Sequence, residues 1–170
     1  MLHTVRLSLE PYGPADERDF WTLFDDPRVT RWLGSAQEGP GHGEMFRRIF
    51  ATPLPGQRFD AWAVREGGQY VGHAEIGPGE GGDGHELTYA LRPQVWGNGL
   101  GREIAEALAA YGLEVLMYDA VYATVDARNA ASLAVLSQAG FVHTKDVTPR
   151  DGRLSRVLTR ESQRVAARLR

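Results

Sequence analysis

A glycine-rich segment in the middle of the chain, within residues 87–102, separates a strand-like run from the start of a long amphipathic run. The strand pattern stops before Pro93, and Gly97, Gly99 and Gly101 follow at alternate positions. Glycine leaves the backbone without Cβ atoms just where a helix presents its unpaired N–H groups, so an anion can approach those groups closely. The segment therefore predicts a strand, a tight loop and a helix whose amino end suits a phosphate group.

Chain length and composition favour one ordinary domain. With 170 residues, of which 42% are hydrophobic, we expect a single domain over residues 1–170. The formal net charge of -3 is untypical of nucleic-acid-binding proteins, which are more often strongly basic. No apolar stretch resembles a signal-peptide core or a membrane span. We therefore expect a cytoplasmic protein with neither nucleic acid nor a membrane as its partner.

Cysteine is absent, and this narrows the available chemistry. Disulfides, thiolate nucleophiles and the usual structural zinc sites all need cysteine. His3, His42, His73 and His143 show no metal-ligand spacing. We predict no metal site, and any catalysis must use other side chains.

Residue periodicity predicts a mixed α/β sheet. Strands are expected at residues 4–10, 59–65, 69–76, 85–91, 120–125, 141–147 and 154–159. Helices are expected at residues 14–26, 44–51, 98–117 and 129–139, with a frayed basic helix at 160–170. Three consecutive strands without intervening helices predict an antiparallel meander, and the following β-α-β-α-β order predicts parallel or nearly parallel flanking strands.

Apolar patterns also predict which side chains face the core. Alternate residues of the first strand form one buried row: Val5, Leu7 and Leu9. Every third or fourth residue of the long helix forms another: Leu100, Ile104, Leu108, Tyr111 and Val115. Three tryptophans are interpreted as core or helix-packing residues: Trp21, Trp32 and Trp62.

The glycine loop has two well-known nucleotide-binding alternatives, and its spacing fits neither. A dinucleotide fingerprint needs G-x-G-x-x-G, whereas the third glycine position falls on Arg102. A P-loop needs a Gly-Lys-Ser/Thr sequence, and no lysine lies near the loop. A strand-to-helix turn without a ligand remains the simplest alternative.

Two separated segments together resemble the GNAT N-acetyltransferase superfamily. Residues 94–99, Gln-x-x-Gly-x-Gly, resemble its acyl-CoA pyrophosphate loop. Residues 129–132, Asn-Ala-Ala-Ser, followed by a helix that ends in Gly140-Phe141, resemble its second signature. The similarity covers roughly residues 3–160, and residues 6–34 resemble the branch that includes the Rim-type ribosomal-protein N-terminal acetyltransferases.

The resemblance implies the GNAT fold, in which the meander and the β-α-β-α-β unit form a central, partly splayed mixed sheet. It also implies transfer of an acetyl group from acetyl-CoA to a primary amine by direct attack in a ternary complex. A protein or peptide N-terminus is the acceptor that the Rim-like similarity implies, and this branch also allows a homodimer. A small-molecule acceptor, such as a polyamine, an amino sugar or an antibiotic, and a non-catalytic acyl-CoA-binding module are the alternatives.

The expected binding residues for acetyl-CoA or coenzyme A lie in the loop, in the strand end before it and at one downstream asparagine. Backbone N–H groups at the helix start suit the pyrophosphate, and Arg102 offers a charge-assisted bond. By resemblance, the pantetheine arm runs along the strand end, and Asn129 binds the arm or the opposite loop. The complete set is Ala90, Leu91, Gln94, Val95, Trp96, Gly97, Asn98, Gly99, Leu100, Gly101, Arg102 and Asn129.

The catalytic candidates are His85, Glu86 and Ser132. An attacking ammonium must lose a proton, so we expect a base or a water chain, and His85 and Glu86 begin the strand that leads to the loop. Adjacent strand residues point to opposite faces, so only one of the two can face the acyl group, and the resemblance to the Rim-like branch favours Glu86 over His85. An ordinary solvated carboxylate at the strand end is the equal alternative for Glu86. The tyrosine that protonates the departing thiolate in many superfamily members is replaced by Leu136. Ser132 is therefore the candidate for that role, with helix capping or packing as the alternative.

An acidic stretch offers a clue to the acceptor. No lysine or arginine occurs between Arg65 and Arg92, although five acidic residues do: Glu66, Glu75, Glu80, Asp83 and Glu86. If this region lines the acceptor groove, it favours a cationic amine. Otherwise these carboxylates form a solvated surface.

Overall fold

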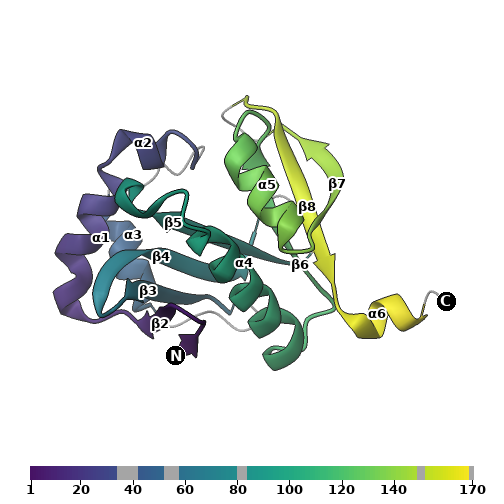
Figure 1. The fold of residues 1–170 in the computed structure, drawn as a ribbon, viewed down its shortest axis with the longest axis horizontal. Coiled ribbons are helices and arrows are strands. Elements are labelled where there is room, and N and C mark those ends of the chain that lie inside the picture. Colours follow the sequence, from purple (N-terminus) through teal and green to yellow (C-terminus); the bar gives the residue numbers. More distant parts are fainter. Residues whose placement is uncertain (34–41, 52–57, 80–83, 149–151, 169–170) are drawn as a thin grey trace.

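The protein folds around one mixed sheet with helices on both faces (Figure 1). The computed structural model describes residues 1–33, 42–51, 58–79, 84–148 and 152–168. The strands are β1 (Leu2–His3), β2 (Leu7–Pro11), β3 (Asp60–Glu66), β4 (Gln69–Pro78), β5 (His85–Leu91), β6 (Ala120–Asp126), β7 (Val142–Val147) and β8 (Ser155–Glu161). The α-helices are α1 (Glu17–Phe24), α2 (Pro27–Thr30), α3 (His42–Ile49), α4 (Leu100–Ala110), α5 (Ala130–Gln138) and α6 (Gln163–Arg168).

The strand order across the sheet is β1-β2-β3-β4-β5-β6-β8-β7, which confirms the predicted mixed α/β class. Strands β2 to β5 form the antiparallel meander. Helix α4 then crosses over to β6, which is parallel to β5. Strand β8 inserts between β6 and β7 and is antiparallel to both, so β6 and β7 run in the same direction, as the helix between them predicted.

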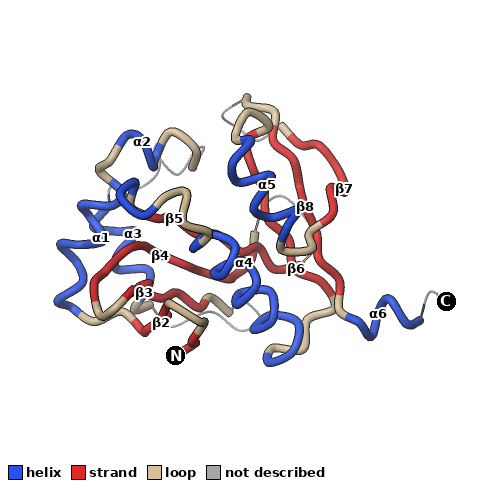
Figure 2. Tube along the Cα trace, viewed as in Figure 1, coloured by secondary structure: helices blue, strands red, loops and turns tan. Residues whose placement is uncertain are grey.

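The sheet is splayed between β5 and β6. These two strands pair only through His85 with Val121 and Glu86 with Tyr122. By contrast, β4 pairs along all of β5, and β8 pairs along all of β6. The sheet therefore consists of two well-paired halves that meet at one end and diverge at the other, as Figure 2 shows for the strands.

Two apolar clusters fill the space between the sheet and its helices. One lies under α4 and α5 and includes Leu100, Ile104 and Leu136. The other lies on the opposite face under α1, α2 and α3 and includes Phe20 and Phe46. The β3–β4 hairpin turn is made by two glycines with positive φ, which is the geometry that suits the right-handed twist of the flanking strands. No helix within the described ranges is both long and apolar enough to span a bilayer.

Two side chains that were predicted to face the core do not. Val5 is 95% exposed because the first predicted strand is interrupted by a turn, in which the Thr4 amide donates to the Leu7 carbonyl and the Leu7 amide returns a bond to the Thr4 hydroxyl. Val115 is 65% exposed because the long helix ends as a π-helical turn, Tyr111–Val115. A π turn has more residues per turn than an α-helix, so the apolar period that places Leu108 inward no longer holds there.

Strands β4 and β5 approach each other closely at the end of β5 that separates from β6, and this approach can be tested. A Cβ on Gly72 would lie 2.3 Å from the Ala90 carbonyl oxygen and 2.8 Å from the Leu91 Cδ2. Gly72→Ala should therefore push the end of β5 aside and lower the free energy of unfolding by about 1–3 kcal/mol. Thermal and denaturant unfolding measure this. Gln69→Ala, at an exposed position of the same strand, is the control, and equal stability of both variants would contradict the packing.

Candidate active site

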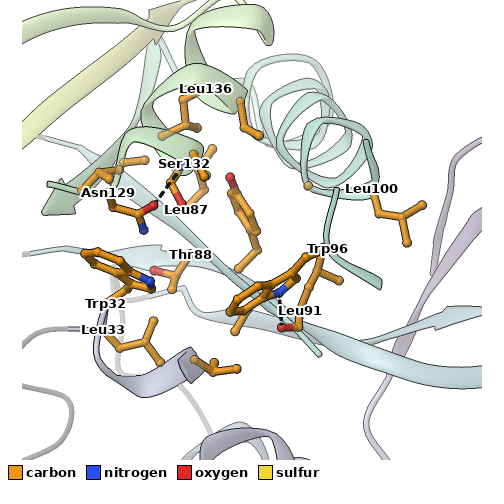
Figure 3. Close-up of a pocket in the computed structure, with 18 of the residues that line it drawn as sticks. Trp32, Leu33, Leu87, Thr88, Leu91, Trp96, Leu100, Asn129, Ser132 and Leu136 are labelled. Atoms are coloured by element: carbon orange, nitrogen blue, oxygen red, sulfur yellow. Dashed lines mark hydrogen bonds between the residues drawn. The ribbon is translucent and has the colours of Figure 1, made fainter. Parts of the chain in front are cut away.

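A cavity of about 470 Å³ lies where β5 and β6 diverge. Its walls come from both strands, from the loop that precedes α4, from the first turns of α5 and from the end of α2 (Figure 3). Ten of the predicted cofactor and catalytic residues line it: Ala90, Leu91, Val95, Trp96, Gly97, Gly99, Leu100, Gly101, Asn129 and Ser132. Residues that are far apart in the sequence thus meet in one cleft.

The glycine loop forms the amino end of α4. After a 3-10 turn, Pro93–Val95, Gly97 and Gly99 both adopt positive φ, at 78° and 79°, and Gly99 is the N-cap of α4. Such values are costly for residues with a Cβ, which explains the glycines. The Trp96 indole N–H donates to the Leu91 carbonyl at 2.8 Å and ties the loop to the end of β5. The loop is therefore fixed on both sides, and its amides belong to the helix end that favours an anion.

Gly101 serves a different purpose, which is close packing. A Cβ placed there would lie 3.4 Å from Tyr89 Cε2 and 3.6 Å from Val135 Cγ1. The first turn of α4 thus lies directly against the tyrosine ring of β5 and the side of α5. Any larger residue at Gly101 would narrow the cavity, because Tyr89 and Val135 both line it.

Three predicted cofactor residues lie beside the cavity and not in its described lining: Gln94, Asn98 and Arg102. The Asn98 carbonyl accepts a hydrogen bond from Arg6 at 2.8 Å. The Arg102 guanidinium binds Glu106 at 2.7 Å, one turn along α4, in a largely exposed pair. Arg102 is thus held along the helix surface in this structure, and its contact with a phosphate stays a prediction.

Asn129 holds the first turn of α5 in place. Its Oδ1 accepts a bond from the Ser132 amide at 3.1 Å, which is an N-cap interaction (Figure 3). Helix capping is therefore performed by Asn129, and the Ser132 hydroxyl is not needed for it. Both side chains remain in the cavity wall, where a ligand can reach them.

Two hydroxyl groups in the cavity wall are buried without a usual partner. Within the described part of the chain, neither Tyr89 Oη nor Thr124 Oγ1 makes a hydrogen bond of normal geometry. Burial raises the pKa of Tyr89 to about 12, and the nearby Ser132 side chain offsets part of that rise. A fully unsatisfied buried hydroxyl costs about 1–3 kcal/mol, which applies directly to Thr124 and in part to Tyr89, whose hydroxyl has only a weak interaction with Ser132. Both groups are suited to a ligand that brings its own donors and acceptors. The two amides of a pantetheine arm fit that requirement.

His85 and Glu86 lie where β5 still pairs with β6, outside the described cavity lining. The His85 ring stacks on Tyr118 at 3.5 Å, and burial lowers its pKa. A Glu86 oxygen accepts a bond from the Thr124 amide at 3.1 Å and so bridges the two diverging strands. Direct contact of either side chain with an acceptor amine stays a prediction, as does proton donation by Ser132.

The sequence did not predict that residues in α2 and just after it form one wall of the cavity. Val29, Trp32 and Leu33 line the cavity opposite α5, although Trp32 was interpreted as a packing residue. Asp26 caps α2 by accepting from the Arg28 amide at 2.9 Å, but nothing local indicates that this short helix reaches β5. No side chain in the described lining carries a charge, so the binding space itself suits neutral groups.

The acidic stretch that hinted at a cationic acceptor is dispersed in the fold. Glu66 ends β3 at the hairpin, and Glu75 binds the buried His73 at 3.0 Å. Glu80 and Asp83 lie outside the described residues. The described carboxylates therefore do not form one groove wall.

Comparison with known proteins shows the family of the chain and the fold that it shares with solved structures. The acetyltransferase (GNAT) domain family matches residues 6–142. The chain is 27% identical over 157 residues to the FsC-acetyl coenzyme A-N(2)-transacetylase of Aspergillus fumigatus, covering 85% of the chain but only 66% of that relative, slightly under two thirds of its length. The structure resembles spermidine N-acetyltransferase from Vibrio cholerae in complex with CoA and spermine, with a TM-score of 0.79, 13% identity, and coverage of 94% and 98% of the two chains.

A second solved structure is the RimL ribosomal L7/L12 alpha-N-protein acetyltransferase in complex with coenzyme A. Its TM-score is 0.77, its identity is 14%, and the similarity covers 94% of this chain and 96% of the other. At such identities the structural likeness establishes the fold alone. The family match, which spans most of the sequence, goes further: the chain belongs to the GNAT acetyltransferase family.

Proposed function

We propose that the protein is an acetyl-CoA-dependent N-acetyltransferase that acetylates a primary amine. One observation carries this proposal: the glycine loop at the amino end of α4 opens directly into the cavity between β5 and β6. An anion site next to a cleft with an uncharged lining matches a molecule with a diphosphate at one end and an uncharged arm at the other. The fungal relative is named as an acetyl coenzyme A transacetylase, and the two solved structures of the same fold are complexes with coenzyme A, which supports this match.

The donor side of the proposed reaction depends mainly on position. Amides at the helix start, from Gly97 to Leu100, hold the diphosphate, because the Val95 and Trp96 amides already donate to carbonyls of the 3-10 turn. The end of β5 and Asn129 hold the arm. Tyr89 and Thr124 supply hydroxyl groups along its path. Because a thioester is already activated, orienting it against the amine accounts for much of the required rate enhancement.

The chemical step is a direct attack. The amine nitrogen forms a bond to the acetyl carbon while the carbon–sulfur bond breaks, and the electron pair of that bond leaves on sulfur. The proton lost by the amine passes to Glu86, or to His85, directly or through water. Ser132 then supplies a proton to the thiolate and regains one from solvent. The net products are an acetamide and free coenzyme A.

The identity of the amine acceptor is the more specific part of the proposal. The Rim-like residues at 6–34 and the likeness to the RimL structure favour a protein or peptide N-terminus. A small-molecule amine is the second candidate, because the spermidine enzyme has the same fold and the fungal relative is named as an N(2)-transacetylase. A non-catalytic acyl-CoA-binding module is the alternative from another class.

A screen for thiol release separates these candidates. Acetyl-CoA would be offered with peptides of varied first residue, polyamines, amino sugars and aminoglycosides, and acetylated products would be identified by mass spectrometry. Turnover with peptides alone supports the N-terminal assignment, and turnover with small amines alone replaces it. Binding of CoA without turnover on any acceptor would contradict the enzyme proposal.

The loop gives the first prediction for this function. Gly99→Glu adds a side chain and a negative charge at the helix N-cap, so CoA binding should fall below detection in titration calorimetry. Gly68→Glu is the matched control, because Gly68 has nearly the same φ, +80°, in the β3–β4 turn with open space around it. Strain and net charge change alike in both variants. Unchanged CoA affinity in the Gly99 variant would refute the proposed anion site.

The buried hydroxyl of Tyr89 gives the second prediction for this function. Tyr89→Phe removes a polar atom that lacks a usual partner, so stability without ligand should stay the same or rise slightly, whereas CoA affinity should fall about three- to tenfold. Tyr111→Phe is the control: its hydroxyl donates to Asp60 at 3.1 Å and accepts from Arg58 at 3.0 Å. That control should lose stability and keep CoA affinity. The opposite pattern would show that Tyr89 Oη serves the fold and not the ligand.

A further inference from the structure

Arg6 connects the N-terminal turn to the glycine loop. It belongs to the segment between β1 and β2, yet its guanidinium reaches the start of α4. One nitrogen, Nη1, donates to the Asn98 carbonyl at 2.8 Å, and Nε and Nη2 both lie 2.5 Å from Glu103 Oε1. A Cβ on Gly99 would lie 3.5 Å from Nη2, so the guanidinium rests directly on the loop backbone.

The contact of Arg6 with Glu103 changes the charge beside the glycine loop. Glu103 lies in the first turn of α4, where a carboxylate stabilises the helix but repels an anion at the same end. Its oxygens accept bonds from Arg6 and from the Thr4 hydroxyl at 2.8 Å. Burial opposes ionisation of Glu103, but these two partners prevail, and its pKa is lowered. The carboxylate is thus ionised and held against a positive charge.

We infer that Arg6 is a positioning residue for the diphosphate of the acyl donor, an inference that rests on the proposed function. Arg6 acts in two ways. It binds the Asn98 carbonyl and so holds the loop backbone, whose amides form the anion site. It also neutralises Glu103, which would otherwise place an unpaired negative charge within one helical turn of the diphosphate.

The other arginines near the loop are held elsewhere. Arg102 binds Glu106 along the outer face of α4. Arg92 binds Asp19 at 2.7 Å and lies over the Tyr70 ring, which belongs to the cluster on the opposite face of the sheet. Among these three arginines, Arg6 is the one whose side chain contacts the loop backbone. Its side chain is 39% exposed, so the site is open to solvent and to a ligand.

The test compares ligands with and without the diphosphate. Titration calorimetry would measure CoA, 3′-dephospho-CoA and pantetheine with wild type and Arg6→Met. We expect the dissociation constants of CoA and 3′-dephospho-CoA to rise by at least about tenfold, and that of pantetheine to stay unchanged, because it lacks the diphosphate. In turnover, KM for acetyl-CoA should rise while kcat and KM for the amine change little.

A double-mutant comparison separates charge from loop geometry. Glu103→Gln in the Arg6→Met background removes the unpaired carboxylate and should recover part of the lost CoA affinity. Arg6→Lys keeps the charge but not the forked geometry, so an intermediate affinity is expected, and this variant replaces Arg6→Met if the latter does not fold. Arg18→Met, at an exposed position of α1, is the control for loss of one positive charge.

Three results would overturn the inference. Unchanged affinity for CoA in Arg6→Met would show that the loop holds the diphosphate without Arg6. An equal loss for pantetheine would indicate general damage to the cleft. A loss of the same size in Arg18→Met would indicate a long-range charge effect. Wild-type protein that binds no CoA at all would instead refute the proposed function, and that failure is visible before any variant is compared.

Discussion

The divergence of β5 and β6 is the constraint on which the site depends. Two residue pairs join these strands, whereas β4 and β8 pair with them along their whole length. Each half of the sheet is therefore fully paired by itself, and the gap between the halves depends on what holds their common end. Glu86 contributes there, because its carboxylate accepts the Thr124 amide just beyond the last backbone pair. A side chain thus takes the place of a ladder bond at the point where the strands separate.

Both helices that border the gap are positioned by the same divergence. Helix α4 begins where β5 ends, and α5 begins where β6 ends, so two helix amino ends come to the open side of the sheet. One of them has the glycine loop and the other has Asn129 as its cap. Gly101 allows α4 to approach Tyr89 and Val135, which leaves the Tyr89 hydroxyl buried but without a usual partner in the described chain. A ligand that hydrogen-bonds to this hydroxyl would therefore remove a polar cost of its burial.

Local patterns were enough to predict most of the fold and to select many of the residues that line the cavity. Strand β5 was predicted with its observed bounds, and Gly99, Asn129 and Ser132 all lie in the cavity lining. Strand alternation and glycine spacing are encoded within a few neighbouring residues, and Asn129 and Ser132 were selected because residues 129–132 resemble the second GNAT signature. The errors arose where a local pattern was interrupted. A turn exposes Val5, and a π turn exposes Val115, and neither interruption changes the apolar spacing in the sequence.

Features that depend on distant segments could not be predicted in this way. Arg6 contacts Asn98 across 92 positions, and no single window of sequence contains both. Trp32 reaches the cavity only because α2 packs beside the end of β5, so its spacing looked like that of any packing residue. The same reasoning explains why the donor was easier to infer than the acceptor. The proposed diphosphate site consists mainly of one continuous loop. The opposite wall combines α2 with two strands and α5, so its chemistry emerges only when these elements meet.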